Sequence, residues 1–362
     1  MGEPRLLVAT RKGLFRFRRK GDGWTAGPPS FLAEPVSAVL ADPRDGALYA
    51  ALRLGHFGVK LHRSDDGGDS WTELPAPAFP AAGDGDAAAP SVDMIWTIES
   101  GGADRPGVLF AGTLPGGLFR SADRGQSWSL VRSLWDLPER ASWSGGGYDI
   151  PGIHSIRVDP RDSRRITLAV SVGGIWKSDD GGDSWRVTGH GLRADYQPPG
   201  MEHDPLVQDP HRLAFGPADS GVAWCQHHNG IFRSDDGAER FVELSEGARP
   251  YVFGFAVAAH PHDPGTAWFV PAVKDECRVP VEARLAVRRT RDGGRSWETL
   301  TDGLPAGASY DLVYRHALDV DGSGRHLAMG STTGNLWSSD DGGERWSLVS
   351  ANLPPIAQVA FA

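Results

Sequence analysis

The chain has 362 residues, and its 46 acidic against 37 basic side chains give a net charge of −9 at pH 7. A nucleic-acid surface needs clustered Lys and Arg, so we expect no nucleic-acid partner. No apolar run reaches the ~20 residues of a membrane span, and the N-terminus lacks the features of a secretory signal, so we expect a cytoplasmic protein without a membrane partner. Two cysteines, Cys225 and Cys277, exclude a disulfide framework and a cysteine-based zinc motif.

One eight-residue phrase, called the box below, recurs along the sequence. It is Ser-Asp-Asp-Gly-Gly-Asp-Ser-Trp at 64–71, and it returns with small changes at 121–128, 178–185, 234–241, 290–297 and 339–346. Recurrence at a nearly constant period predicts a repeat architecture, in which each period is one structural unit.

The residues of the box predict a hairpin turn. Its third position is always an acid that can accept backbone N–H groups of its own turn, and the glycine that follows it in most boxes tolerates a positive φ. The closing aromatic residue buries a large ring where the chain turns back. Six similar acids at one period favour a structural role over a catalytic one: Asp66, Asp123, Asp180, Asp236, Asp292 and Asp341.

In chain order, each repeat reads as four short strands separated by turn residues, which is typical of a β-propeller. The first repeat lacks its first strand, and the C-terminal segment 355–362 resembles the strand that opens the second repeat. We therefore predict an all-β, single-domain, seven-bladed propeller with four-stranded antiparallel blades, closed by its C-terminal strand. The predicted blades are 5–28 with 355–362, then 35–77, 92–133, 152–190, 211–247, 251–301 and 309–350.

This topology separates the boxes from the long loops. The boxes connect the third and fourth strands of their blades, whereas the crossovers between blades and the turns between second and third strands open on the opposite face. The segments 75–92, 132–152, 189–210 and 271–286 all belong to that opposite face. Loops of this length in a compact fold are commonly functional, so we place the predicted ligand site there.

Histidines gather in the predicted blades 4 and 5. His154 and His211 open equivalent first strands, while His227, His228 and Asn229 form one turn of blade 5. Three interpretations remain open. The imidazoles bind a divalent metal such as zinc, with His154, His211 and His227 or His228 as ligands. They act as acid–base or hydrogen-bonding groups toward a polar substrate. Or they pack between blades with satisfied hydrogen bonds.

Other polar and aromatic side chains of the same face suit a sugar or an anionic small molecule. The candidates for substrate binding are His154, His211, Asn229, Arg11, Arg53, Tyr148, Tyr251 and Arg278.

The Ser-x-Asp-x-Gly-x-x-Trp boxes resemble the Asp-box (BNR) repeats of the sialidase superfamily, and the resemblance covers all seven predicted blades. The chain also resembles bacterial BNR-repeat proteins labelled exo-α-sialidase or glycosyl hydrolase, xyloglucan-active glycoside hydrolases, sortilin-type receptors and the photosystem II assembly factor. The resemblance implies a propeller and leaves the activity open, because these relatives include both enzymes and binding proteins.

The leading hypothesis is a glycoside-hydrolase-like enzyme that acts on a carbohydrate or another polar small molecule at the mouth opposite the boxes. Glu202 or Asp149 would act with His227 or His228 as acid–base groups. One alternative is a non-catalytic scaffold that presents this face to a protein partner. A second is a propeller that holds a divalent metal in its histidine cluster.

Overall fold

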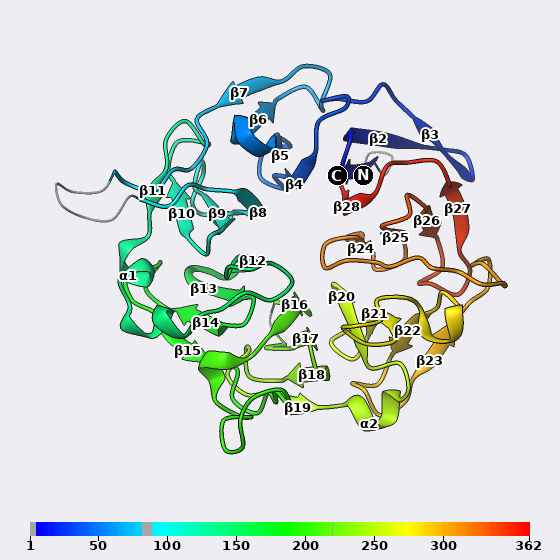
Figure 1. Ribbon diagram of the computed structural model, residues 1–362. Helices are drawn as coiled ribbons and strands as arrows, with labels where there is room; N and C mark the ends of the chain where they lie inside the picture. The colour runs from blue at the N-terminus through cyan, green and yellow to red at the C-terminus, as the bar shows by residue number, and fades with distance from the viewer. Residues whose placement is uncertain (1–4, 82–88, 219) are drawn as a thin grey trace.

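The computed structural model describes residues 5–81, 89–218 and 220–362. These residues form a ring of seven sheets around a central channel (Figure 1). Each sheet has four strands, and neighbouring strands in every sheet are antiparallel. The predicted fold class is confirmed.

The strands of a sheet follow one another from the channel outward. Blade 1 contains β28 (Ile356–Phe361), β1 (Arg5–Thr10), β2 (Gly13–Lys20) and β3 (Gly23–Ala26). Blade 2 contains β4 (Val36–Ala41), β5 (Leu48–Arg53), β6 (Val59–Ser64) and β7 (Thr72–Leu74). Blade 3 contains β8 (Met94–Ser100), β9 (Leu109–Leu114), β10 (Leu118–Ser121) and β11 (Ser129–Leu130). Blade 4 contains β12 (Ile153–Asp159), β13 (Asp162–Val170), β14 (Gly174–Ser178) and β15 (Arg186–Thr188).

The remaining blades have the same plan. Blade 5 contains β16 (Pro210–Phe215), β17 (Ala223–His227), β18 (Gly230–Ser234) and β19 (Val242–Glu243). Blade 6 contains β20 (Phe253–Ala259), β21 (Ala267–Ala272), β22 (Val287–Thr290) and β23 (Glu298–Leu300). Blade 7 contains β24 (Leu318–Val320), β25 (Leu327–Gly330), β26 (Leu336–Ser339) and β27 (Ser347–Ser350).

Helices are short and lie in the connections. They are α1 (Arg132–Trp135), α2 (Ser245–Ala248) and the 3₁₀ turns η1 (Gly55–Phe57), η2 (Pro138–Ser142), η3 (Pro205–Val207) and η4 (Val281–Ala283). Among the described residues, no helix has the length and apolar character needed to cross a membrane.

The two ends of the chain close the ring. Strand β28 pairs antiparallel with β1, so that Val359 lies opposite Val8 and both chain ends meet in blade 1 (Figure 1). Gln358 extends this contact to blade 2, because its side-chain amide accepts the N–H of Val39 at 2.9 Å and donates to the carbonyl oxygen of Val39 at 3.0 Å. This pairing covers the inner edge of β1, which would otherwise be exposed.

The boxes fold into tight turns held by their own side chains. In the first box, the Ser64 hydroxyl accepts the N–H of Gly68 at 2.8 Å and donates to Asp66 at 2.7 Å. The two carboxylate oxygens of Asp66 accept the N–H of Ser70 at 2.9 Å and its hydroxyl at 2.6 Å. The same bonds recur in the boxes at 121–128, 178–185 and 290–297. The box carboxylates therefore stabilise the turns, as their repetition predicts.

The core lies between neighbouring blades. Separate apolar clusters fill successive interfaces, and one large cluster joins blades 1, 6 and 7. The rings that close the boxes contribute unequally: Trp346 and Phe241 are 1% and 2% exposed, whereas Trp71, Trp128 and Trp297 are half-buried. The sequence predicts an aromatic anchor in every box, but only some of these rings reach the interior.

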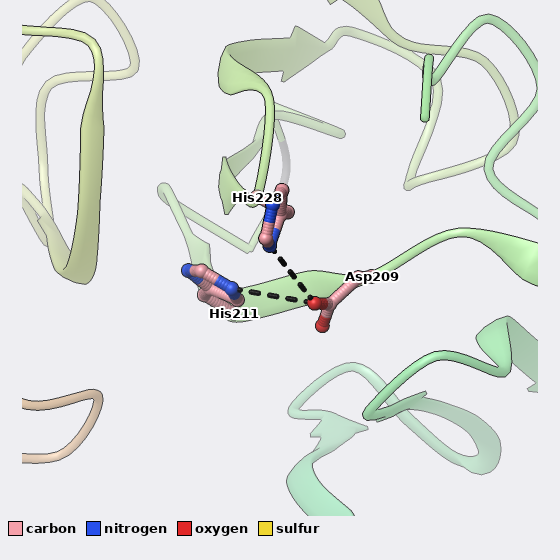
Figure 2. A group of neighbouring side chains, drawn as sticks. All are labelled: Asp209, His211 and His228. Atoms are coloured by element: carbon pink, nitrogen blue, oxygen red, sulfur yellow. Dashed lines mark ion pairs between the residues drawn. The ribbon is translucent and has the colours of Figure 1, made fainter. Parts of the chain in front are cut away.

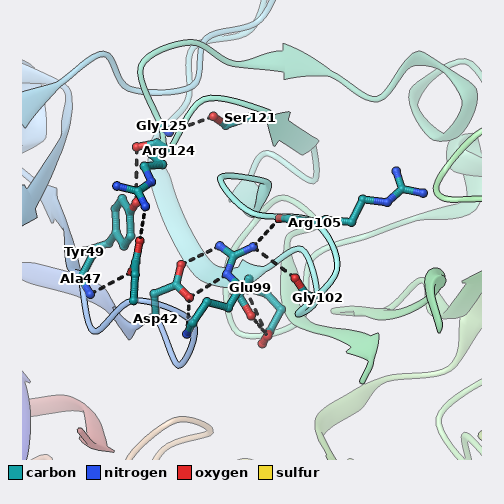
Figure 3. A network of polar contacts seen from close by, with 12 residues as sticks. Asp42, Ala47, Tyr49, Glu99, Gly102, Arg105, Ser121, Arg124 and Gly125 are labelled. Atoms are coloured by element: carbon teal, nitrogen blue, oxygen red, sulfur yellow. Dashed lines mark hydrogen bonds and ion pairs between the residues drawn. The ribbon is translucent and has the colours of Figure 1, made fainter. Parts of the chain in front are cut away.

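Polar contacts also bind blades together on the box-bearing face. Arg44, in the turn between β4 and β5, donates to Asp42 at 2.6 Å and to the carbonyl oxygen of Arg105 in blade 3 at 2.7 Å (Figure 3). Arg124 of blade 3 reaches back and pairs with Asp45 at 2.8 Å. These contacts join blades 2 and 3 on the box-bearing face.

Trp346→Ala tests the anchoring role of a buried box ring. We expect the free energy of unfolding to fall by ~3–5 kcal/mol, because the substitution opens a cavity in the cluster shared by blades 1, 6 and 7. Urea denaturation measures the loss. Leu348→Ala, whose side chain is 55% exposed, is the control and should change stability by less than ~0.5 kcal/mol. Equal losses for the two variants would contradict this assignment.

Asp292→Ala tests the box carboxylates through pH. Hydrogen bonds from Ser296 lower the pKa of Asp292 to about 2. A carboxyl whose folded pKa is depressed adds stability above its unfolded pKa of ~3.9 and loses that stability as pH falls toward its folded pKa. We therefore expect Asp292→Ala to lower the melting temperature at pH 7 and to have a smaller effect near ~pH 2.5. Asp22→Ala, in the exposed β2–β3 turn, is the control. If the fall in melting temperature of Asp292→Ala is as large near ~pH 2.5 as at pH 7, Asp292 does not stabilise the turn as a carboxylate.

Candidate functional site

The boxes and the His228–Asn229 turn of blade 5 lie on opposite faces of the ring. Strand β18 runs from the turn at 228–229 to Ser234, where the fourth box begins. A strand of this length separates its two ends by ~15 Å, so the imidazoles of that turn open away from the boxes. The face bearing this turn and the blade crossovers is called the loop-side mouth below.

Local bulges redirect one side chain at the start of each of five innermost strands. Five innermost strands lose register just after their first residues, and a bulge of this kind leaves one residue unpaired and redirects its side chain. The residues at these shifts are Ser37, Trp96, His154, His211 and Phe255. The equivalence of His154 and His211, inferred from spacing alone, therefore has a structural cause.

A cavity of about 550 Å³ opens at this mouth beside blades 5 and 6. Its walls come from the crossover glycines 145–147, from the turn of blade 5 and from the insertion between β21 and β22. The polar lining residues are Tyr196, Asp209, His211, His228, Asn229, Lys274, Asp275, Glu276, Arg278 and Arg315.

Asp209, His211 and His228 lie side by side in the lining of this cavity (Figure 2). Oδ2 of Asp209 lies 3.4 Å from Nε2 of His211 and 3.3 Å from Nδ1 of His228. Asp209 and His211 are buried, while the His228 side chain is 24% exposed. The backbone places them together, because the carbonyl oxygen of Asp209 accepts the N–H of His228 at 3.0 Å.

His211 is held rigidly. Its Nδ1 lies 2.6 Å from the carbonyl oxygen of Gly254, which can only accept, so Nδ1 carries the proton and Nε2 turns toward Asp209. The ring stacks on Phe255 with centroids 4.6 Å apart and planes at 14°. Burial lowers the pKa of His211, which favours the neutral ring.

The three groups influence one another electrostatically. Burial alone would raise the pKa of Asp209, but the hydrogen bond from His228 and the charge of Arg315 hold the pKa well below its usual range. Burial acts to lower the pKa of His228, yet the hydrogen bond and charge of Asp209 raise it overall. Asp209 is therefore a buried carboxylate that keeps its negative charge.

Arg315 forms part of the floor. Its guanidinium carbon lies 5.2 Å from the Trp96 ring centroid and 5.4 Å from that of Phe255, so the cation contacts two aromatic rings. Arg278 also approaches Phe255, at 5.4 Å, and pairs with Asp275 at 2.5 Å. Arg278 and Arg315 also line a second hollow of about 290 Å³ at the same mouth.

Six of the predicted site residues meet at these hollows. His211, His228, Asn229 and Arg278 line the larger one, and Arg11 and Tyr148 line the smaller one together with Arg278. Arg53 lies at the edge, where its guanidinium stands 5.5 Å from the Tyr148 ring and pairs with Asp93.

The other predicted site residues lie elsewhere. Glu202 accepts the N–H of Gly200 in the crossover at 2.7 Å, and Asp149 is exposed on the crossover before blade 4. Tyr251 packs under Arg288, at 5.1 Å. None of these three is among the described residues that line the two hollows.

His154 and His227 are buried supports. His227 accepts the N–H of Asp209 through Nε2 at 3.1 Å and packs on Phe232, and burial lowers its pKa to about 3. His154 bonds Ser155 at 3.0 Å and contacts the Trp96 ring. The structure thus does not gather His154, His211 and His227 as a ligand set. Among the described residues, the group close enough to share an ion is Asp209, His211 and His228.

Sequence reasoning did not select Asp209 or Arg315 for the site. Asp209 directly precedes β16 and lies two residues before His211, so its closeness in sequence was an available signal. Arg315 gave no such signal, because it reaches the cavity from the segment before β24, and only the closed ring brings that segment beside blade 5.

Comparison with known proteins identifies xyloglucanases as relatives. The chain is 27% identical over 321 residues to a xyloglucanase from Paenibacillus sp, covering 76% of this chain and 29% of that protein. It is 23% identical over 285 residues to the xyloglucanase Xgh74A from Acetivibrio thermocellus, covering 71% and 32% of the two chains. The chain therefore spans about a third of the length of these relatives. No family model matches the sequence.

Solved structures show the same fold at lower identity. The GH74 xyloglucanase from Xanthomonas campestris superposes with a TM-score of 0.67 at 19% identity, covering 97% of this chain and 53% of that chain. YCF48 from Cyanidioschyzon merolae superposes with a TM-score of 0.54 at 16% identity, covering 93% and 88%. The comparisons thus show a propeller with xyloglucanase relatives, and the resemblance to sialidase-type repeats stays a prediction.

His227→Ala tests the supporting role of that ring. We expect a loss of ~2–4 kcal/mol, because the variant removes buried contacts and leaves the N–H of Asp209 without its acceptor. Asp149→Ala, on an exposed loop, should change stability by less than ~0.5 kcal/mol. Chemical denaturation of both variants measures the difference, and similar stabilities would show that His227 does not support the site.

Proposed function

We propose that the protein is a glycoside-hydrolase-like enzyme that binds a glucan chain of the xyloglucan type at the loop-side mouth. The observation that supports this most directly is the cavity itself, which combines aromatic surface, fixed cations and carboxylates at the mouth free of boxes. The xyloglucanase relatives support the same class of substrate.

The cavity has the composition that sugars require. Pyranose rings present apolar faces and a rim of hydroxyl groups, and sites of ~300–1,000 Å³ with a few oriented polar groups hold such ligands. Phe253 and Phe255 supply apolar wall, while Asn229 and Arg278 supply polar contacts. The second hollow shares Arg278 and Arg315 with the first, so the two together can hold successive sugar units.

Hydrolysis would require carboxyl groups in the cavity. In glycoside hydrolysis one carboxylic acid donates a proton to the glycosidic oxygen, and a second carboxylate assists the water that attacks the anomeric carbon. Asp275 and Glu276 are the lining carboxylates that do not contact an imidazole, and they enter on the insertion between β21 and β22. We propose these two in place of Glu202 and Asp149, which lie outside the hollows.

Xyloglucan cleavage tests the proposal. Purified protein is incubated with xyloglucan, with unbranched glucan for comparison, and new reducing ends are measured and sized by mass spectrometry. We expect cleavage of xyloglucan and a fall of ~100-fold or more in rate for Asp275→Asn, because that variant removes an ionisable group and retains the side-chain shape.

Binding is measured separately by calorimetry with xyloglucan oligosaccharides. Tyr196→Ala, at the cavity wall, should weaken binding, whereas Tyr310→Ala should not, because Tyr310 is 64% exposed and is not among the lining residues. Binding without any cleavage would contradict the enzymatic part of the proposal. Equal losses for the two tyrosine variants would contradict the location.

A further inference from the structure

We infer that Asp209, His211 and His228 bind one divalent transition-metal ion at the loop-side mouth. The three offer one carboxylate oxygen and two imidazole nitrogens that lie within 4.8 Å of one another (Figure 2). Two imidazoles and one carboxylate are a common ligand set for zinc, iron and related ions, and three protein ligands leave positions open for water or substrate.

The separations fit shared coordination better than direct hydrogen bonding. Charge-assisted N–H···O bonds are ~2.7–2.9 Å long, whereas Asp209 lies 3.4 Å from His211 and 3.3 Å from His228. Two atoms that each lie ~2.1 Å from one ion at near-tetrahedral angles are ~3.0–3.4 Å apart. The two distances from Asp209 match the separation of neighbouring ligands around a common ion.

The orientation of His211 provides an independent argument. Because Nδ1 donates to the carbonyl oxygen of Gly254, Nε2 is the nitrogen of His211 that faces the carboxylate of Asp209. A histidine that binds a metal through one nitrogen and a backbone carbonyl through the other has this arrangement.

Asp209 has spare bonding capacity and space beside it. Its Oδ1 is buried and has no hydrogen-bond partner in the described part of the chain. A Cβ added at Gly146 would lie 3.2 Å from Oδ1 and 3.3 Å from Oδ2, so the bare glycine keeps the approach to the carboxylate open. Buried polar atoms without partners in native structures call for an explanation, and a bound ion supplies one.

The surrounding charge is mixed. Arg315 acts on Asp209 electrostatically and opposes a cation, while Asp275 and Glu276 face the same cavity and favour one. The neutral nitrogen ligands select a transition ion over calcium or magnesium, which prefer oxygen ligands. The open coordination positions face the cavity, where the ion would contact a bound water or a substrate oxygen.

The test uses untagged, chelator-treated full-length protein and zinc alone as the ligand. We expect one equivalent of zinc by calorimetry and by elemental analysis, with a dissociation constant below ~10 µM. Asp209→Asn and His228→Ala should each weaken binding by more than ~10-fold. Asp209→Asn preserves the side-chain shape, and His228→Ala alters a partly exposed ring, so we expect at least one of them to fold. Circular dichroism checks the fold of each variant.

His56→Ala is the matched control, because His56 is an exposed histidine in the corresponding turn of blade 2. It should bind zinc like the parent protein. Substitution by Co²⁺ should give visible absorption bands that Asp209→Asn removes. Absence of stoichiometric zinc and cobalt binding, or an equal loss in His56→Ala, would overturn the inference.

The inference does not rest on the proposed carbohydrate activity. Zinc affinity is measured without any sugar, and xyloglucan binding can be measured in the presence of chelator. Zinc binding without xyloglucan binding would contradict only the proposed function, and the reverse result would contradict only the metal site.

Discussion

The pairing of β28 with β1 is the constraint on which the rest of the structure depends. It closes the ring through Val8 and Val359, and Gln358 joins the closing strand to the neighbouring blade through Val39. A closed ring has a fixed set of innermost strands around one channel. The mouth can therefore bring together residues from blades far apart in the sequence, such as His211 and Arg315.

The two faces of the closed ring have different roles. The boxes stabilise the ring through bonds within each turn and through apolar clusters between blades. On the other face, bulges in the innermost strands direct single side chains toward the channel. The loop-side mouth thus contains buried polar groups such as Asp209. The free-energy cost of burying its carboxylate is offset by neighbouring charges and by the rigid fold around it.

Much of this arrangement follows from patterns along the chain. Recurring boxes predict the blades, and the C-terminal segment predicts closure, because both depend on local turn and strand chemistry that is legible in short segments. The spacing of His154 and His211 predicts equivalent positions, and both do lie at bulges. The pattern could not show which ring faces the cavity: His211 lines it, whereas His154 packs beside Trp96.

The sequence by itself determined the repeat, the number of blades, and the face that bears the histidines, since each depends on turns that a few adjacent residues specify. Only the tertiary structure decided which side chains share a site. Asp209, His211 and His228 meet because two adjacent strands and one turn of blade 5 hold them together, and Arg315 joins them because the ring is closed. Distances across a ring depend on the packing of all its blades, and no local pattern encodes them.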